Sequence, residues 1–502
     1  MPASANAAIS GAEARRAARN AAALAAASVV GRGVQFGWQL ALAPWLGVAA
    51  YGIYGTVGAL MAVGASIAHF GMGPILIRDV SRYPERAGKY LTATLVLQTL
   101  LALAAYLVVN GAGLGYSDEI RAYIALAGVS LLVDSLGNLC NDLLLAQERM
   151  RLTSAVTVGH IILLVALAAL ALANGLGLAG VYLATLLAGV VRSALLWLLV
   201  RRSGVHPSWP LDRAIAAPLL LNSLPLAVSA FLSLTYQHAD KFMTTLLIGT
   251  TGTGYLTAAF VIIFGVVELL NTTVLLALYP LMSRYYGDGR NPMFGFIVEK
   301  LAFFNPLVSL PIALALSIFD IAVPLFGEDF RPTADVLRIL IWFAVVTMIA
   351  AVLARGLVIQ NRQRLLLGLR VLGLAANVTL NLLLLPALGV RGAAIASVCS
   401  EVLVVVLLLR HFHAAGWDFR RLAPRWLRLG LLAALVAVVM LSLREVHPAL
   451  GIVVGLSLYG AGILVMRVLA PDDWDLLYRL VAAMPGGSLV LKRWQRDVKL
   501  TW

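Results

Sequence analysis

Several charged and amide side chains lie inside long apolar stretches of this sequence, where they are best placed to do chemistry. Arg32, Gln35 and Gln39 recur at i, i+3 and i+7, so they share one face of a helix. In a later stretch, Gln237 and Lys241 also share a face. An ionisable group in hydrocarbon is costly unless it faces a cavity or a partner, and a buried cation suits a phosphate-bearing ligand. We therefore predict that these five residues line a substrate-binding cavity.

Four further polar residues occupy similar apolar stretches. Asp240 and Asn271 are added to the predicted cavity lining, although a structural pair with a neighbouring helix explains Asp240 equally well. Glu268 and Asp134 lie near the middle of their stretches, where a desolvated carboxyl can carry a proton. We predict ion coupling, by protons or sodium, at these two carboxyls.

The high hydrophobicity of the chain indicates that these residues lie on membrane helices. The chain has 502 residues, of which 61% are hydrophobic and 12% charged, and its mean hydropathy is +0.91. Soluble proteins are about a quarter charged, so a water-soluble globular protein is excluded. About 20 apolar residues span a bilayer, and we predict an all-α, polytopic membrane protein with fourteen spans, at 21–46, 53–77, 90–112, 122–145, 153–173, 177–200, 217–247, 254–280, 298–325, 334–358, 366–386, 389–410, 427–444 and 450–470.

The net charge of +14 indicates topology rather than nucleic-acid binding. Basic residues gather after the even-numbered spans, as in Arg201, Arg202 and Arg213, which predicts that both termini are cytoplasmic. The first apolar run continues to Leu46, too far for a cleaved signal peptide. The two cysteines lack metal or redox spacing, so no metal site is expected. No loop is long enough for a catalytic domain, and we predict no catalytic residues and no enzyme activity.

An internal repeat organises the spans. Gly47 and Gly52 recur as Gly249 and Gly254, and Ser81-Arg82-Tyr83 recurs as Ser283-Arg284-Tyr285, all displaced by the same 202 positions. Spans one to six and seven to twelve are therefore two copies of one unit. Each copy has an even number of spans, so the repeat is parallel, with its pseudo-two-fold axis along the membrane normal.

This repeat predicts two six-helix lobes around a central cavity, plus two extra helices. Further along, the segment 146–152 recurs as 359–365, displaced by 213. With that displacement Asp142 corresponds to Arg355, which suggests a latch between the lobes at an inner gate. The alternative is that each side chain reaches the nearby cytoplasm. The predicted parts are a cytoplasmic N-terminal tail 1–20, an N-lobe 21–205, a C-lobe 206–412, the last two spans 413–470 and a cytoplasmic amphipathic tail 471–502.

Three glycine-punctuated segments carry a family resemblance. They are Trp45 to Tyr54 (WLGVAAYGIY), Gly71 to Arg82 (GMGPILIRDVSR), and His238-Ala239-Asp240-Lys241 followed by Ile248-Gly249 and Gly254-Tyr255. Together with the repeat, they make the chain resemble the polysaccharide transporter family of the multidrug/oligosaccharidyl-lipid/polysaccharide exporter superfamily. The resemblance implies a flippase for undecaprenyl-diphosphate-linked oligosaccharide repeat units in the bacterial cytoplasmic membrane. It also implies membrane lipid, a polysaccharide polymerase and a chain-length regulator as partners, with no cofactor.

Three alternatives remain. A cation-coupled multidrug antiporter of the same superfamily normally has twelve spans, and the basic residues Arg32 and Lys241 favour an anionic lipid-linked substrate instead. A polytopic polymerase or ligase would need a large loop, and none is present. The lipid II flippase family carries arginines in its first, second and eighth spans, whereas here only the first has one, and Gly33 follows it.

Overall fold

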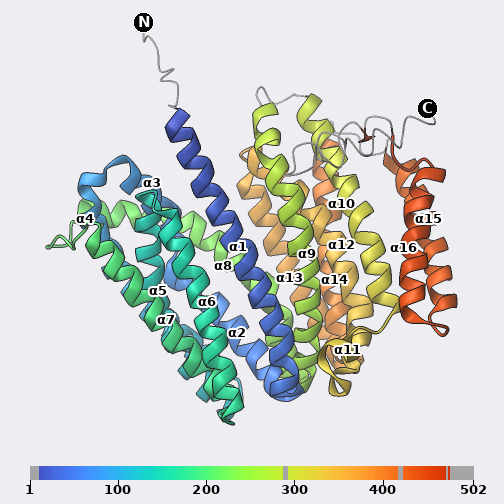
Figure 1. The fold of residues 1–502 in the computed structure, drawn as a ribbon, viewed down its shortest axis with the longest axis horizontal. Helices are drawn as coiled ribbons and strands as arrows, with labels where there is room; N and C mark the ends of the chain where they lie inside the picture. Colours follow the sequence, from blue (N-terminus) through green and yellow to red (C-terminus); the bar gives the residue numbers. More distant parts are fainter. Residues whose placement is uncertain (1–10, 287–291, 416–421, 471–472, 475–502) are drawn as a thin grey trace, which may run out of the picture. The chain divides into compact units, whose positions relative to one another are not determined.

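The computed structural model describes residues 11–286, 292–415, 422–470 and 473–474, with the side chains of all but 11–28, 268–285 and 292–293. Within these ranges every regular element is helical, and no strand occurs. The elements are α1 (Gly11–Leu46), α2 (Val48–His69), α3 (Met72–Arg82), η1 (Pro84–Arg86), α4 (Ala87–Gly113), α5 (Asp118–Ala146), α6 (Met150–Ala173), α7 (Gly177–Arg202), α8 (Arg213–Ile248), α9 (Thr250–Tyr285), α10 (Pro292–Ile318), α11 (Ala322–Phe326), η2 (Glu328–Phe330), α12 (Pro332–Ile359), α13 (Gln363–Leu388), α14 (Val390–Ala414), α15 (Ala423–Leu443) and α16 (Pro448–Val465) (Figure 1).

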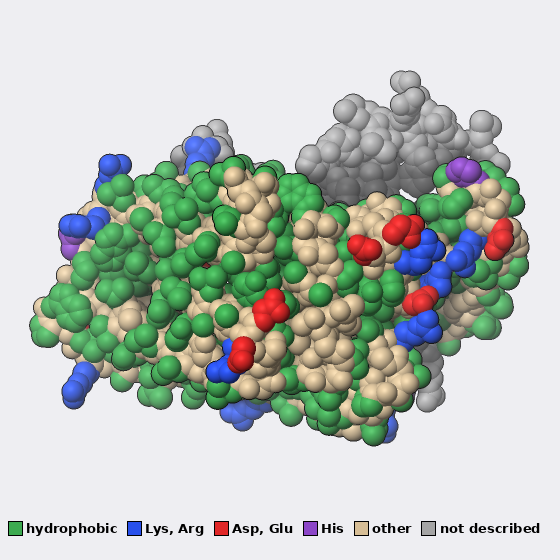
Figure 2. Space-filling view, turned by 90° about the horizontal axis from the view of Figure 1, so that it is seen from below, with side chains coloured by type: hydrophobic (Ala, Val, Ile, Leu, Met, Phe, Trp, Pro, Cys, Tyr) green, Lys and Arg blue, Asp and Glu red, His purple; other side chains and the backbone are tan. Residues whose placement is uncertain are grey.

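The helices confirm the predicted all-α membrane architecture. Thirteen stretches within the described ranges are long and apolar enough to cross a membrane, with α2 and α3 counted as one. The predicted first span lies within α1, which completes fourteen. Large apolar side chains remain exposed on these helices, such as Leu107 (68%) and Val465 (81%). Hydrophobic side chains also cover much of the face drawn in Figure 2. The chain is a multi-pass membrane protein.

The second predicted span, 53–77, lies within one candidate membrane stretch, Val48–Arg82, which is broken into two helices. Phe70 and Gly71 have φ of 49° and 64°, in the left-handed region, so α2 ends at His69 and α3 begins at Met72. A Cβ at Gly71 would come within 2.6 Å of the Leu226 side chain and 2.9 Å of the Ala227 nitrogen on α8. Glycine thus provides both the backbone turn and the close approach of α8.

Two compact units can be distinguished. The first contains residues 1–265, 322–336 and 370–400, and the second contains 266–321, 337–369 and 401–502. In the first unit, α4 and α6 lie on either side of α5 and α7 (Figure 1), and a core around Ile53, Ile124 and Tyr182 joins α2, α5 and α7. Our division into repeat-based lobes stays a prediction.

In the second unit, the extra hairpin α15–α16 packs on α10. Pro311 cannot donate a backbone hydrogen bond, which leaves the carbonyl of Leu307 without its usual helical partner. The Tyr459 hydroxyl of α16 donates to that carbonyl at 2.7 Å. Asp473, which is fully buried, accepts hydrogen bonds from Lys300 of α10 and from Arg425 of α15. The hairpin is therefore held to α10 by polar contacts at two levels.

Candidate functional site

A buried carboxylate joins α8 to α13 and α14 within the first unit. Asp240 is 3% exposed. Its Oδ1 accepts hydrogen bonds from the side-chain amides of Asn377 (2.9 Å) and Asn381 (2.7 Å), and its Oδ2 accepts one from the Ser397 hydroxyl (2.6 Å). All three donors are neutral, so none of them balances the charge of the carboxylate. A buried charge needs compensation, and the neighbouring Lys241 supplies part of it. The neutral hydrogen-bond partners leave the carboxylate itself able to take a proton or a small cation.

An additional acceptor lies in the same cluster. The side-chain oxygen of Asn381 is buried and has no hydrogen-bond partner among the described residues. Carboxylate, amide and hydroxyl oxygens are the ligands that hard cations prefer. Asp240, Asn381 and Ser397 together can therefore hold a cation with oxygen atoms alone. We had not predicted the asparagines and the serine, because their spacing becomes meaningful only once α13 and α14 are seen to flank Asp240.

Two basic residues flank the Asp240 cluster. The Lys241 ammonium lies 5.8 Å from the centre of the Phe260 ring, and Gln237, one turn earlier on α8, is exposed. Arg370 of α13 lies 5.7 Å from the ring centre of Tyr236. Cation–π contacts of this kind stabilise a cation without neutralising its charge. Arg370 was missing from our predictions, although it shares a helix face with Asn377 and Asn381.

The polar face of α1 is partly exposed. Gly31 packs against α6, where a Cβ would come within 2.9 Å of Ile161. Arg32 and Gln35 are exposed, and Gln39 is half-buried. The side chains predicted to line a cavity are thus at least partly exposed, and Phe36 on the same side of α1 packs against Gly265 of α9, where a Cβ would come within 2.5 Å of its ring.

A second polar cluster connects α2, α5 and α7. Arg192 donates to the side-chain oxygen of Asn138 at 2.7 Å and lies 3.9 Å from Asp134. Arginine can only donate, so the group of Asn138 that faces Arg192 is the amide oxygen. The amide nitrogen of Asn138 then faces His69 Nε2, at 2.9 Å, and donates to it. His69 Nε2 must therefore accept. His69 is therefore neutral and serves as a packing residue here. Arg192 was missed in the sequence, although it lies at the depth of Asp134.

The remaining predicted residues lie apart from these clusters or outside the described side chains. Glu268 and Asn271 belong to α9, but their side chains are among those not described. Asp142 lies on α5 against Gly73, where a Cβ would come within 2.6 Å of its carboxylate. Arg355 is half-buried on α12, in the other unit. The Asp142–Arg355 latch stays a prediction.

The helices α2 and α9, which correspond to each other in the repeat, cross where a glycine of each contacts the backbone of the other. We call this place the α2–α9 crossing (residues 48–57 and 250–257). A Cβ at Gly52 would overlap the carbonyl oxygen of Thr250, and one at Gly254 would overlap that of Val48. Gly52 corresponds to Gly254 in the repeat, and Val48 to Thr250. The contact is therefore reciprocal, as expected beside a two-fold axis that relates the copies.

Hydroxyl groups fasten this crossing to α8. The side-chain oxygen of Thr245 lies 2.5 Å from that of Thr56 and 2.6 Å from that of Thr253. The Thr56 hydroxyl also contacts the carbonyl of Gly52, at 2.9 Å. Thr245 follows Asp240 by little more than one helical turn. One helix thus carries both the buried carboxylate and the residue that ties α2 to α9.

Comparison with known families assigns the chain to one of them. The model of the family described as "Polysaccharide biosynthesis protein" matches residues 17–286, more than half of the chain. The chain belongs to the polysaccharide biosynthesis protein family. This membership confirms the resemblance noted in the sequence.

Individual relatives agree with the family. The chain is 24% identical, over 403 residues, to the probable low-salt glycan biosynthesis flippase Agl15 of Haloferax volcanii, covering 78% of this chain and 82% of that protein. Its fold is similar to that of the lipid II flippase MurJ in an inward closed conformation, with a TM-score of 0.75, 13% identity and coverage of 88% of this chain and 98% of MurJ.

A multidrug resistance MATE family transporter of the MOP superfamily, in an inward-facing conformation, is also similar. Its TM-score is 0.58 at 17% identity, with coverage of 77% of this chain and 95% of the transporter. This polysaccharide biosynthesis family member therefore has the fold of the superfamily's flippases and exporters.

Proposed function

We propose that this protein is a flippase that moves undecaprenyl-diphosphate-linked oligosaccharide repeat units across the bacterial cytoplasmic membrane, for an O-antigen, capsule or exopolysaccharide. The observations that support the proposal are the polar residues Arg32 and Gln35, which are exposed on the predicted first span, and the membership of the polysaccharide biosynthesis protein family. A polymerase and a chain-length regulator are its proposed partners, and both termini are proposed to be cytoplasmic.

The basic side chains bind the diphosphate of the substrate, and the amide side chains bind its sugars. Arg32 and Lys241 donate charge-assisted hydrogen bonds to the diphosphate, which are stronger than neutral ones. Gln35, Gln39 and Gln237 provide amides that both donate and accept, as sugar hydroxyls require. The lipid tail stays in the bilayer, because moving it into a polar cavity would forfeit its hydrophobic stabilisation.

Transport proceeds by alternating access, and the α2–α9 crossing is the outer closure. While the glycines of the two copies touch, the substrate enters from the cytoplasmic leaflet. Separation of the crossing releases it to the outer leaflet, and the Asp142–Arg355 latch then closes the inner side.

Asp240 is the proposed site of the coupling cation, which is a proton or sodium. Its hydrogen-bond partners Asn377, Asn381 and Ser397 are all neutral, whereas Asp134 already has Arg192 at 3.9 Å. Lys241 acts electrostatically on Asp240, as Arg192 does on Asp134, so Asp240 is proposed on the ground of its three neutral hydrogen-bond partners alone. Glu268 remains a further candidate.

Replacing the two basic cavity residues tests the substrate assignment. Removing a charged hydrogen-bond partner costs about 1.5–3 kcal/mol, so Arg32→Ala and Lys241→Ala are each expected to weaken apparent substrate affinity about 10- to 100-fold. Polymer export by cells lacking the wild-type protein measures this loss. Arg151→Ala is the matched control, because Arg151 is exposed in the first turn of α6.

Full export by both variants at wild-type expression would show that neither residue holds the diphosphate. Loss of export by Arg151→Ala as well would show that the assay responds to any lost positive charge.

A further inference from the structure

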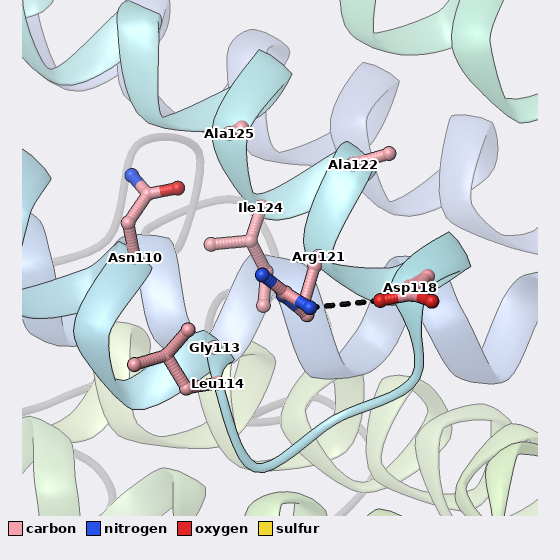
Figure 3. A pocket seen from close by; sticks show the side chains of 8 residues that line it. All are labelled: Asn110, Gly113, Leu114, Asp118, Arg121, Ala122, Ile124 and Ala125. Carbon is pink, nitrogen blue, oxygen red and sulfur yellow. Dashed lines mark hydrogen bonds and ion pairs between the residues drawn. The ribbon is translucent and has the colours of Figure 1, made fainter.

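A hollow of about 430 Å³ lies where α4 turns into α5 (Figure 3). This volume is within the range of about 300–1,000 Å³ that is usual for small-molecule sites. Asn110 of α4 and Arg121 of α5 border it from opposite helices, and Leu114 and Ile124 contribute apolar surface. The transport site proposed above uses none of these residues.

The polar groups around the hollow offer both donors and acceptors. The Arg121 guanidinium donates to Asp118 at 2.8 Å and lies between Asp118 and Asn110 in Figure 3. The amide nitrogen of Asn110 is committed to the Tyr106 carbonyl at 2.8 Å, which leaves the amide oxygen to accept. Arg121 and Asp118 balance each other in charge. The site therefore suits a neutral ligand with many hydroxyl groups better than an anion.

The position of the hollow limits what can reach it. Leu100, Leu103 and Leu107 are exposed along one stripe of α4, and Asn110 and Leu114 continue that stripe with the same helical spacing. Leucines exposed on a membrane helix face lipid, so the hollow opens at the point where the lipid-facing stripe becomes polar. The topology deduced from the basic residues places this end of α4 on the outer side.

We propose that this hollow binds a sugar unit of the lipid-linked glycan once it has reached the outer leaflet. The proposal rests on the proposed flippase function, which delivers a glycan to this level of the membrane. Hydroxyl groups of the sugar bond to Arg121, Asp118 and Asn110, and the C–H face of the ring packs on Leu114 and Ala122, which are both exposed. The hollow thereby holds the product beside the transporter before the next pathway component takes it.

Saturation-transfer NMR on the purified full-length protein tests the site directly, with free glucose, galactose, mannose, rhamnose and N-acetylglucosamine as probes and inorganic phosphate as the anion. At least one sugar is expected to bind. Arg121→Gln is expected to weaken that binding about tenfold or more, through loss of a charged donor. Ala125→Leu, which fills the hollow, is expected to have a similar effect.

Arg331→Gln is the matched control. Arg331 also forms an exposed i, i+3 ion pair, with Glu328 at 2.7 Å, and should leave sugar binding unchanged. Thermal melting of each variant confirms that it is folded. Binding of phosphate alone, or sugar binding that both hollow variants leave unchanged, would overturn the proposal.

This test is separate from that of transport. A protein that flips its substrate but binds no sugar at the hollow contradicts only the present inference. A protein that binds sugar there but flips nothing contradicts only the proposed function.

Discussion

Gly254→Ala is expected to abolish transport, although it adds a single methyl group. The new Cβ would overlap the carbonyl oxygen of Val48, and backbone atoms cannot move aside as a flexible side chain can. The α2–α9 crossing could then no longer close, so the transporter would lose its outer closure. Gly52→Ala should act in the same way, because its Cβ would overlap the carbonyl of Thr250. Export of the polymer should fall at least about tenfold, which corresponds to about 1.4 kcal/mol.

Gly58→Ala is the matched control for the crossing. Gly58 lies on the same helix as Gly52, but no neighbouring atom lies within 4 Å of a Cβ built there. The same substitution therefore adds the same methyl group without a clash. A membrane-impermeant thiol reagent applied from outside gives a second measurement, with a cysteine placed at Thr257, which is buried at the crossing and whose hydroxyl has no hydrogen-bond partner among the described residues. Labelling should increase with Gly254→Ala and not with Gly58→Ala.

Two results would contradict this account of the outer closure. One is normal export by Gly254→Ala at wild-type expression. The other is an equal loss of export by Gly58→Ala, which would show that α2 tolerates no added methyl group anywhere.

Asp240→Asn is expected to remove the dependence of transport on the coupling cation while leaving the protein folded. The amide keeps one acceptor for Asn377 and Asn381 but has no charge to bind a cation. If the cation is sodium, a hundredfold excess over its Kd stabilises the wild type by about 2.7 kcal/mol. Thermal melting in sodium against equimolar potassium should show this stabilisation in the wild type and none in the variant. If the cation is a proton, only the response to a pH gradient is lost.

Comparing Asp240→Ala with Asp240→Asn shows whether Asp240 acts in cation coupling or only stabilises the fold. Asp240→Ala leaves the three donors without their acceptor, at about 1–3 kcal/mol for each buried group, so it should lower the melting temperature where Asp240→Asn does not. Asp134→Asn is the control for coupling, because this carboxyl is paired with Arg192. Cation dependence that survives Asp240→Asn but disappears with Asp134→Asn would move the coupling site to α5.

Features carried by a single helix or by the repeat could be predicted from the sequence. Apolar length located the spans to within a few residues, and the shared face of Arg32 and Gln35 was read from their spacing alone. The register of Gly52 with Gly254 revealed the duplication. That these two glycines touch the opposite copy could not be predicted, because spacing along a chain does not show which helices approach each other.

Features made by several helices were missed for the same reason. Asn377, Asn381 and Ser397 are ordinary polar residues of membrane helices until Asp240 is found between them. The glycines of the second span permit bending, but the exact place of the break could not be predicted, because Phe70, a bulky residue, adopts the left-handed conformation beside Gly71. A glycine on its own is common in membrane helices and does not show where a helix ends.

Flipping in proteoliposomes tests the central claim most directly. The purified protein is reconstituted with fluorescent undecaprenyl-diphosphate-linked oligosaccharide in both leaflets, and an impermeant glycosidase digests only the outer pool. The account predicts that the wild type makes nearly all of the substrate accessible to the enzyme, and that the Arg32→Ala, Lys241→Ala double variant leaves the inner pool protected, as in empty liposomes. An inner pool that stays protected with the wild type, in liposomes that take up a cationic drug, would contradict the account and indicate an antiporter.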